Sequence, residues 1–455
     1  MTREEGPHSD RSDRYCVIGA GTSGLSAAKN LLDVGVPVDV IEREDDIGGN
    51  WYYGSPSSSV YSSAHLISSK AFAGFLDFPM PADYPDYPGH AQVLAYLHDY
   101  ARHFGLHQHI ELGRRIVDVR PRTEGGWTAT LDGGETRHYR GVVVANGHHH
   151  RPRLPQYAGS FRGNEVHSAD YRRADRFTGK RVLVVGGGNS GCDLAVDLIP
   201  FADRTLLSMR RGYHFWPKFV LGRPIDELHE LTHRLRLPLP LRRVSARLLL
   251  RAFVGRLEDY GLPTPDHRVF ESHLVINSRL LYHLRHGDLQ VRPDVAELRG
   301  DRVLFTDGTE AEIDVIVYAT GFEPAFDFLE GAGLSWKEGV PELYLNLFHP
   351  ERDDLFFVGL VQPDVGIWRL ADQQARLMAA FVAAQQGGHG SARELCIRKA
   401  GPSPRMSPHS YVASPRHRLE VEHAMYERLL RQHLGRLVRQ RRSTTNAVTV
   451  AEIPT

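Results

Sequence analysis

Two glycine-rich stretches, GAGTSG at residues 19–24 and GGGNSG at residues 186–191, have the spacing of turns that hold a dinucleotide. Each follows a short apolar run and opens an amphipathic one, as a strand–turn–helix unit requires. Glycines at the first, third and sixth positions let the main chain approach a pyrophosphate at a helix N-terminus, where free N–H groups and the helix dipole favour the anion. We therefore predict dinucleotide contacts at Gly19, Gly21, Gly24, Gly186, Gly188, Asn189, Ser190 and Gly191.

The residues that follow each unit's second strand predict which ribose each turn holds. Glu42 ends the strand after the first turn, where a carboxylate can accept hydrogen bonds from both ribose hydroxyls. The stretch SMRRG at 208–212, after the second turn, has no acid and contains Ser208, Arg210 and Arg211. Guanidinium groups bind a ribose 2′-phosphate with charge-assisted bonds of about 1.5–3 kcal/mol, whereas a carboxylate repels it. The alternative is that the two arginines are a solvated pair in a connecting loop.

The two turns thus predict two different cofactors. An unmodified ribose at the first turn suits FAD, and a 2′-phosphate at the second suits NADPH, so the simplest interpretation is a flavoprotein that NADPH reduces. A disulfide reductase would need a CxxC pair, but Cys16, Cys192 and Cys396 are far apart in the sequence. Single-component aromatic hydroxylases normally have only one such turn. The remaining class is that of oxygen-using flavoenzymes in which NADPH binds stably.

The glycine turns lie in two copies of one plan, a strand, a turn, a helix and a second strand, at 15–42 and 181–209. Between them, residues 89–106 have apolar side chains at helical spacing, and 126–147 contain two stretches typical of antiparallel strands. The apolar run at 314–322 predicts another buried strand that ends in a glycine turn. The predicted fold class is therefore α/β, with two Rossmann-like dinucleotide-binding domains.

The positions of these units predict the domain boundaries. We expect a discontinuous FAD-binding domain at 15–172 and 315–455, with the NADP-binding domain inserted at 173–314. A helical insertion is expected within the latter at about 220–280. Residues 1–14 are charged and have no apolar core, so we expect a disordered N-terminal extension there.

Composition limits the partners of the chain. It has 455 residues, and Lys+Arg and Asp+Glu both number 55, so no net charge directs it to nucleic acid or to an anionic membrane. No apolar run approaches the ~18 residues that a membrane span needs, and no secretory signal is present, so we expect a cytoplasmic protein. A basic amphipathic helix expected at 416–441 suits a solvated or subunit-facing surface, and a homodimer is the commonest expectation. His148, His149 and His150 are consecutive, so their side chains diverge and no metal site is predicted.

Residues 161–173, FRGNEVHSADYRR, have a pattern that suits neither a helix face nor a strand face. They match FxGxxxHxxxY(K/R), the fingerprint of the flavin-containing monooxygenases, and the chain resembles a soluble bacterial member of that family of class B flavoprotein monooxygenases. Further segments resemble the family in the same order: GGNW at 48–51, residues 68–85, ANGHH at 145–149, ATGF at 319–322, GLVQP at 359–363 and QAR at 374–376.

The resemblance implies a two-step reaction. NADPH reduces FAD, oxygen adds at flavin C4a to give a hydroperoxide that NADP⁺ protects, and one oxygen atom then passes to a nucleophilic nitrogen or sulfur. The substrate would be a small-molecule amine or sulfide, as for an N,N-dimethylaniline-type monooxygenase, in a pocket that excludes water. The resemblance also implies that the fingerprint joins the two nucleotide domains, and that cofactor contacts come from Gly49, Trp51, Thr320, Gly321 and Gln362.

One departure from the family concerns the reaction centre. The family usually has an asparagine beside the flavin where this chain has Ile67, so His65 or Ser68 would have to supply that hydrogen bond. Trp51 would either cover the flavin or pack in the core. The candidate catalytic residues are therefore Ser68, His65 and Trp51.

Two other functions stay open. The segment 261–288 resembles a bacterial subgroup that includes enzymes accepting NADH and Baeyer–Villiger enzymes, which oxidise a ketone to an ester or lactone. Dedicated Baeyer–Villiger enzymes typically have tryptophan where the fingerprint has Tyr171 here, and the family's usual TGY is TGF, with Phe322. The other function is that of a flavoprotein that only senses redox state, which the two intact glycine turns argue against.

Overall fold

The first sheet is built around the first glycine turn. The computed structural model describes residues 8–234 and 237–450, and β1 (His8–Ile18), α1 (Thr22–Asp33) and β2 (Val38–Ile41) form the expected βαβ unit with parallel strands. The other strands are β3 (Ile110–Glu111), β4 (Ile116–Pro121), β5 (Trp127–Leu131), β6 (Thr136–Val144) and β24 (Leu355–Phe357). The order is β3-β2-β1-β6-β5-β4, and β24 pairs with β6. As predicted, β5 and β6 are antiparallel.

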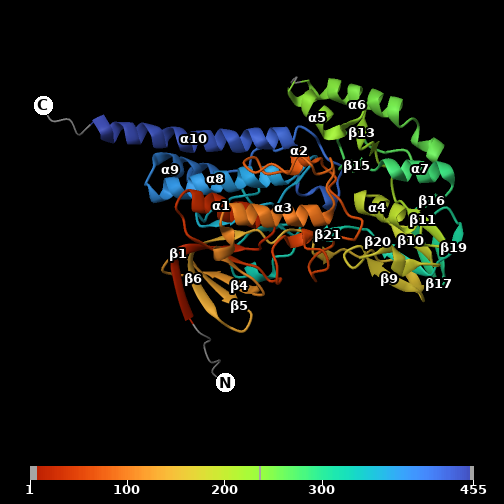
Figure 1. Ribbon diagram of the computed structural model, residues 1–455, viewed down its shortest axis with the longest axis horizontal. Coiled ribbons are helices and arrows are strands. Elements are labelled where there is room, and N and C mark those ends of the chain that lie inside the picture. Colours follow the sequence, from red (N-terminus) through yellow and green to blue (C-terminus); the bar gives the residue numbers. More distant parts are fainter. Residues whose placement is uncertain (1–7, 235–236, 451–455) are drawn as a thin grey trace.

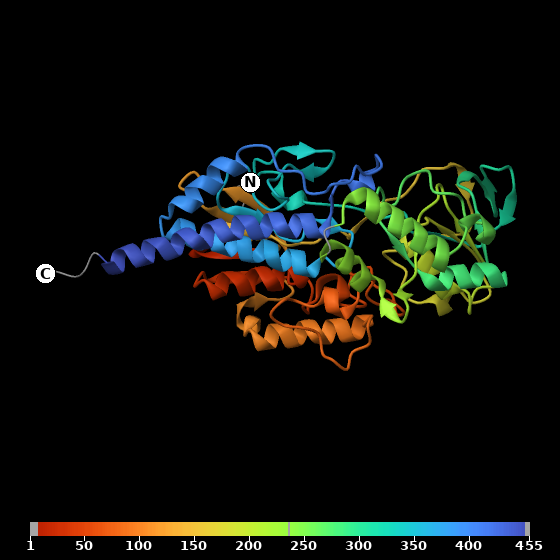
Figure 2. The same cartoon turned by 90° about the horizontal axis from the view of Figure 1, so that it is seen from above.

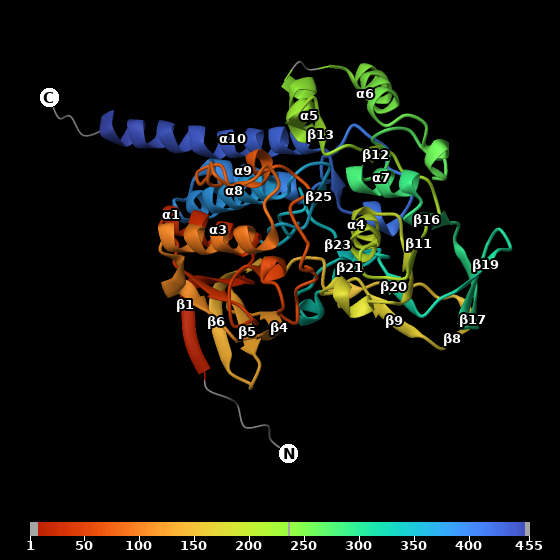
Figure 3. The same ribbon diagram turned by 45° about the vertical axis from the view of Figure 1, so that its right-hand side comes forward.

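The second sheet is built around the second glycine turn and is parallel throughout. Its βαβ unit consists of β10 (Arg181–Val185), α4 (Asn189–Leu198) and β11 (Arg204–Ser208). The remaining strands are β9 (Asn164–His167), β16 (Leu289–Arg292) and β20 (Val315–Tyr318), in the order β16-β11-β10-β20-β9. Figure 3 shows the two sheets side by side, each with its glycine-turn helix above it.

Two strands lie in the second sheet although the sequence analysis places them in the flavin-binding part. Strand β9 precedes the expected boundary at 172/173, and β20 follows the one at 314/315, yet both belong to the sheet of β10. An apolar run shows that a strand is buried, but its pairing partners depend on contacts that are distant in sequence. The chain therefore enters the second sheet earlier, and leaves it later, than the expected boundaries.

A smaller sheet and a helical insertion extend the second sheet. The smaller sheet has the order β19-β18-β17-β8, with β8 (Ala158–Phe161), β17 (Val295–Gly300), β18 (Arg302–Phe305) and β19 (Glu310–Glu312). The insertion contains α5 (Ile225–Arg234), α6 (Leu239–Phe253) and α7 (Ser278–His286). Its short strands are β12 (Phe215–Trp216), β13 (Phe219–Val220), β14 (Arg223–Pro224) and β15 (Val275–Ile276), so the helical character expected at 220–280 is present.

Helices cover one face of the first sheet, as Figures 1 and 2 show. Helix α1 packs directly on the strands, α8 packs on α1, and α10 packs on α8. Besides α1, the helices on this side are α2 (Lys70–Ala73), α3 (His90–His103), α8 (Trp368–Gln386), α9 (Gly390–Lys399) and α10 (His423–Val450). Short strands complete the fold: β7 (Arg151–Pro152), β21 (Phe322–Glu323), β22 (Trp336–Lys337), β23 (Val340–Pro341), β25 (Gln362–Pro363) and β26 (Glu420–Val421). Within the described ranges, none of the helices combines the length and the apolar character needed to cross a membrane.

The C-terminal helix begins later than the sequence predicts. The basic helix expected at 416–441 starts at His423, because the preceding residues form a 3₁₀ turn, Pro415–His417, and then strand β26. In β26 the main-chain N–H and C=O groups form hydrogen bonds with β25, so they are not available for the hydrogen bonds of a helix. Amphipathic spacing alone does not detect such a competing strand.

Buried polar contacts hold α8 against α1. The carboxylate of Asp372, which is fully buried, accepts hydrogen bonds from Ser26 Oγ (2.8 Å) and Asn30 Nδ2 (3.0 Å) on α1. Arg376 Nε lies 2.7 Å from the other carboxylate oxygen and supplies the compensating charge. Because the buried carboxylate is both paired and hydrogen-bonded, these contacts fix the position of α8 relative to the first glycine-turn helix.

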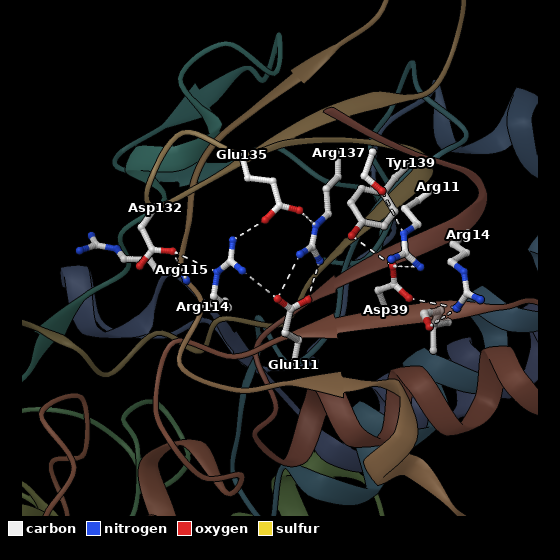
Figure 4. A network of polar contacts seen from close by, with 12 residues as sticks. Arg11, Arg14, Asp39, Glu111, Arg114, Arg115, Asp132, Glu135, Arg137 and Tyr139 are labelled. Carbon is white, nitrogen blue, oxygen red and sulfur yellow. Dashed lines mark hydrogen bonds and ion pairs between the residues drawn. The ribbon is translucent and has the colours of Figure 1, made fainter. Parts of the chain in front are cut away.

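Part of the N-terminal extension is ordered, contrary to the expectation for residues 1–14. Strand β1 starts at His8 and its first residues pair with β6, and Arg14 Nη1 lies 3.0 Å from an Asp39 carboxylate oxygen. Figure 4 shows Arg11 and Arg14 beside Asp39. The charged side chains of the extension, which suggested disorder, therefore form ion pairs with Asp39 of the neighbouring strand. The composition of the extension does not reveal these partners. Residues 1–7 lie outside the described residues.

A network of ion pairs connects the edge strand β3 of the first sheet with β6. Arg137 on β6 makes two hydrogen bonds to the Glu111 carboxylate, at 2.6 and 3.0 Å, and one to Glu135 at 2.6 Å. Arg114 bonds to Glu135 as well, at 2.6 Å (Figure 4). The two guanidinium groups lower the pKa of Glu135 to about 2. The network therefore fastens β3, which consists of two residues, to the rest of the sheet.

Candidate cofactor-binding site

The first glycines of the two turns have the same main-chain environment. Gly19 has φ +103° and donates its N–H to Ile41 O at 2.9 Å. Gly186 has φ +124° and donates to Ser208 O at 3.0 Å. Both φ values lie where side chains are disfavoured, so glycine is required by the turn itself. The two turns are thus copies of one structure.

The sixth glycine of each turn is required by close packing. A Cβ on Gly24 would lie 1.8 Å from Gly19 O, and a Cβ on Gly191 would lie 1.7 Å from Gly186 O. Neither backbone oxygen can move without breaking the turn. Glycine is therefore required at these two positions so that the helix can pack closely against the turn. This requirement exists whether or not a cofactor is bound.

The third glycine of the first turn lies against a second glycine-rich segment. Gly21 is the residue before α1, and a Cβ on it would lie 3.5 Å from Gly49 Cα, an ordinary contact distance. Gly49 has φ +55°, and a Cβ on it would lie 3.0 Å from Gly21 Cα. The two main chains are therefore in contact at the N-terminus of α1, where a phosphate would bind. This arrangement fits the pyrophosphate of a dinucleotide.

Glu42 lies where a carboxylate would reach the ribose of that dinucleotide. It directly follows β2 and is buried, and its carboxylate accepts hydrogen bonds from the N–H groups of Ala20 (2.6 Å) and Glu44 (3.1 Å). Burial raises the pKa of Glu42 and the two N–H groups oppose that rise. Since each carboxylate oxygen has a further lone pair, Glu42 can still accept bonds from ribose hydroxyls.

The residue equivalent to Glu42 at the second turn is Met209. Gly19 bonds to the last residue of β2 and Gly186 bonds to the last residue of β11, so the following residues, Glu42 and Met209, correspond. Met209 is buried and packs toward Gly187, where its Cε would lie 2.5 Å from an added Cβ. No carboxylate occupies this position, so a phosphate group there meets no fixed negative charge.

The two arginines expected at the second turn differ in their surroundings. Arg211 Nη2 lies 2.9 Å from an Asp266 carboxylate oxygen, so its charge is partly neutralised. Arg210 is exposed and has no ion pair with an acid anywhere in 8–234 and 237–450. Ser208 is buried and donates its hydroxyl to Pro293 O at 2.8 Å. Of these residues, Arg210 is therefore the one whose polar group is available to a phosphate.

Asn189 and Ser190, at the start of α4, also differ. The Asn189 amide donates to Leu274 O at 2.9 Å and accepts from the Ile276 N–H at 2.8 Å, so it holds the strand β15. Ser190 is exposed in the first turn of α4. The first main-chain N–H groups of α4 have no partner within the helix, so they can donate to a ligand whatever the side chains are. Asn189 thus has a structural role that the sequence analysis does not predict.

Three further candidates lie in short connections. Thr320 donates its hydroxyl to Arg153 O, and Gly321 follows it with φ +88°. Gln362 donates its main-chain N–H to Leu419 O at 2.7 Å, within the β25–β26 pair. The half-buried Gln362 side chain makes no hydrogen bond to other residues of the described ranges. These positions are compatible with cofactor contacts and do not by themselves require them.

Two of the three candidate catalytic residues, Trp51 and Ser68, lie next to the turn that precedes α8. Trp51 is partly buried and makes an edge contact with Trp368, with ring centroids 6.2 Å apart. Ser68 Cβ would lie 3.5 Å from a Cβ on Gly366. Both residues therefore border residues 366–368, at the start of α8. The contact with Trp368 supports the interpretation that Trp51 packs in the core.

His65, the third candidate, is turned toward the insertion. Its Nε2 contacts the ammonium group of Lys218, and its Nδ1 lies 3.1 Å from Ser63 O. A lysine ammonium only donates, so Nε2 accepts and Nδ1 carries the proton that bonds to Ser63 O. Both ring nitrogens are thus engaged with protein. Ile67, between His65 and Ser68, is 37% exposed.

The fingerprint segment connects the second glycine-turn helix with the loop that contains residues 61–62. Tyr171 donates its hydroxyl to an Asp197 carboxylate oxygen on α4 at 2.8 Å and makes an edge contact with Tyr61 at 5.9 Å. Arg172 O accepts the N–H of Ser62 at 2.9 Å. One end of the fingerprint therefore contacts both the second glycine-turn helix and residues 61–62, which supports its expected role as a linker.

Arg416 is a candidate that the sequence analysis misses. Its Nη1 would lie 3.4 Å from a Cβ on Gly188, the residue before α4, and its guanidinium carbon lies 5.6 Å from the Tyr213 ring centroid. No acid in the described part of the chain forms an ion pair with it. Residue 416 is the first residue of the expected basic helix, more than two hundred residues after Gly188. No local signal links the two, because the proximity arises only in the folded chain.

Comparison with known proteins adds an independent observation. Residues 12–387 match the family described as flavin-binding monooxygenase-like. Flavin-containing monooxygenase 5 of Oryctolagus cuniculus is 34% identical over 389 residues, which cover 80% of this chain and 72% of that protein. Flavin-containing monooxygenase 2 of Homo sapiens is 33% identical over 385 residues, again covering 80% of this chain and 72% of that protein.

Solved structures show the same fold. The flavin-containing monooxygenase from Stenotrophomonas maltophilia has a TM-score of 0.64 and 24% identity, covering 83% of this chain and 99% of that chain. Cyclohexanone monooxygenase in its epsilon-caprolactone-bound Loose conformation has a TM-score of 0.67 and 18% identity, covering 93% of this chain and 98% of that chain. These likenesses confirm the α/β fold with two Rossmann-like units that the sequence predicts.

Proposed function

The chain belongs to the flavin-binding monooxygenase-like family, and we propose that it is an N,N-dimethylaniline-type monooxygenase whose substrates are tertiary amines or sulfides. It is a flavoprotein monooxygenase that uses FAD, NADPH and O₂ and acts on a small molecule. One observation carries the assignment of the two cofactors to their turns. The turns have the same main-chain packing but are followed by Glu42 in one and by Met209 and Arg210 in the other.

We assign FAD to the first turn, with the pyrophosphate at the N-terminus of α1 beside Gly21 and Gly49 and the ribose at Glu42. NADP(H) is assigned to the second turn, with its 2′-phosphate at Arg210. A flavin held there would supply the redox chemistry, namely acceptance of electrons from NADPH and activation of O₂. The flavin-binding part would comprise the first sheet with α8 to α10, and the coenzyme-binding part the second sheet with α4 to α7.

The residues near the expected reaction centre would exclude water and offer one hydrogen bond. Ile67 presents an apolar, partly exposed side chain where the family usually has an amide. Both nitrogens of His65 are engaged with Lys218 and Ser63, so we assign the hydrogen bond to Ser68. An apolar wall with one hydroxyl favours transfer of oxygen to a nucleophile over release of hydrogen peroxide, which water promotes.

The test supplies NADPH and ¹⁸O₂ with N,N-dimethylaniline, methyl phenyl sulfide or cyclohexanone, and identifies products by mass. We expect one labelled oxygen atom in an N-oxide or a sulfoxide, with NADPH consumed in step. A labelled lactone from cyclohexanone, with no amine or sulfide product, would establish the Baeyer–Villiger alternative. Release of peroxide equal to the NADPH consumed, with every substrate unchanged, would overturn the proposal.

We propose further that Arg416 neutralises the pyrophosphate of NADP(H) at the second turn. An Arg416→Ala variant should bind NADP⁺ about 10- to 100-fold more weakly, because one charge-assisted bond is lost. Its FAD content should not change, since Arg416 lies at Gly188 and not at the first turn. Titration of tryptophan fluorescence with NADP⁺ measures the affinity.

Arg418→Ala is a matched control two residues away. Arg418 Nε lies 2.9 Å from a Glu338 carboxylate oxygen, so its charge is already used. The control should bind NADP⁺ as the unmodified protein does. Equal affinities of the Arg416 and Arg418 variants would show that Arg416 does not contact the coenzyme.

A further inference from the structure

Residues 218–226, called here the 218–226 hairpin, connect the coenzyme-binding part to the segment that carries Ile67. The hairpin consists of β13 and β14 with Leu221 and Gly222 at its tip. Lys218 directly precedes β13 and Asp226 is the second residue of α5. Figure 1 shows β13 and α5 at the boundary between the two parts, near α2.

The two ends of the hairpin contact residues on either side of Ile67. Lys218 Nζ contacts His65 Nε2. Asp226 accepts the main-chain N–H of Ser69 at 2.6 Å, and both of these residues are buried. The segment 65–69 is therefore held at both ends by charged side chains of the insertion, while its middle residue, Ile67, is 37% exposed.

Other contacts keep the hairpin itself in place. Lys218 O accepts the hydroxyl of Tyr87 at 2.7 Å and the N–H of Ile225 at 3.0 Å. The Lys218 N–H donates to Ser278 Oγ at 3.0 Å, and its ammonium lies 5.0 Å from the centroid of the Tyr87 ring. Lys218 is thus fixed between the insertion and residue 87 of the flavin-binding part.

The charges at the two ends are withdrawn from water, because Asp226 is buried and Lys218 is half-buried. Burial lowers the pKa of Lys218, and the nearby charge of Asp193 opposes that change. Burial raises the pKa of Asp226, and hydrogen bonds from the Ser69 and neighbouring N–H groups oppose it. Removing a charged group from water costs folding free energy that hydrogen bonds only partly offset, so stability alone does not account for these charges.

We propose that Lys218 and Asp226 are positioning residues that hold the segment 65–69 against the flavin site; these two contacts are called here the clamp. The second, functional half of the proposal is that the clamp limits the release of hydrogen peroxide. Only the second half rests on the proposed function. The clamp comes from the coenzyme-binding part, so the enclosure of the flavin site depends on the correct placement of that part. Its loss would let water reach the site beside Ile67.

The first measurement is amide hydrogen exchange of the peptide containing Ser69 in the protein as isolated. In Asp226→Ala the Ser69 amide loses its acceptor, and we expect exchange there to be about 10- to 100-fold faster. Asp226→Asn keeps a side-chain oxygen as acceptor and should restore most of the protection. Unchanged exchange in Asp226→Ala would overturn the clamp.

The second measurement is the share of NADPH electrons recovered as hydrogen peroxide in the presence of a substrate. We expect this share to rise in Asp226→Ala and in Lys218→Met, and to fall back in Asp226→Asn. Arg223→Ala, an exposed position on the same hairpin, is the control and should match the unmodified protein. Faster exchange without more peroxide would overturn the functional half. An unmodified protein that makes no oxygenated product would instead contradict the proposed function.

Discussion

A Gly21→Ala variant is expected to fold normally and to lose its flavin. A Cβ at this position would lie 3.5 Å from Gly49 Cα, so the protein accommodates a methyl group without a clash. The same methyl group would occupy the space through which the main chain approaches the pyrophosphate. We expect FAD affinity to fall on the order of 100-fold, which corresponds to about 2.7 kcal/mol. The ratio of flavin to protein absorbance after purification measures the loss.

Variants of two other glycines serve as controls that distinguish a loss of FAD binding from a loss of stability. Gly35 has φ +79° with no atom within 4 Å of an added Cβ, so Gly35→Ala should be folded and fully loaded with FAD. Gly24→Ala would place its Cβ 1.8 Å from Gly19 O and should lower the unfolding temperature of the flavin-free protein. Gly21→Ala should unfold at the same temperature as unmodified flavin-free protein. A Gly21→Ala variant that retains its full flavin content would show that the pyrophosphate does not bind at Gly21.

The second large effect is expected for Arg210→Ala, which should weaken use of NADPH and leave use of NADH nearly unchanged. Loss of one guanidinium–phosphate contact should raise the apparent NADPH constant about 10- to 100-fold. NADH has no 2′-phosphate, so its binding involves no contact with Arg210. The rate of flavin reduction under anaerobic conditions, measured over a range of each coenzyme, gives the two constants directly.

Arg211→Ala is the matched control for that experiment. Arg211 lies beside Arg210 but forms an ion pair with Asp266 at 2.9 Å, so its removal should change the NADPH constant much less. A larger effect in Arg211→Ala than in Arg210→Ala would exchange the roles of the two residues. Equal losses with NADPH and NADH in Arg210→Ala would show that Arg210 does not bind the 2′-phosphate.

Short-range pattern made the two glycine turns predictable. Each turn needs glycine at defined positions because of the chain's own geometry, as the φ of Gly19 and the contact at Gly24 show. Such requirements lie within one βαβ unit, so a single sequence reveals them. The helical insertion and the antiparallel pair β5–β6 were predictable for the same reason.

Assignments that depend on distant contacts were less predictable. The strand character of β9 and β20 was visible, but their membership of the second sheet was not. Residues 8–14 looked like a disordered extension, yet Asp39 and β6 order them. Among the site residues, Ser208 and Asn189 have their side chains bonded within the protein, which no spacing indicates.

The sequence by itself determined the α/β class, the two glycine turns and the difference in charge after them, because these features are local and repeat within one unit. Only the tertiary structure decided which charged groups stand beside those turns. Arg416 reaches Gly188 from the C-terminal part, and Lys218 and Asp226 reach His65 and Ser69 from the insertion. Charged groups act on neighbours in space within a few ångströms, and sequence separation places no limit on which groups become neighbours.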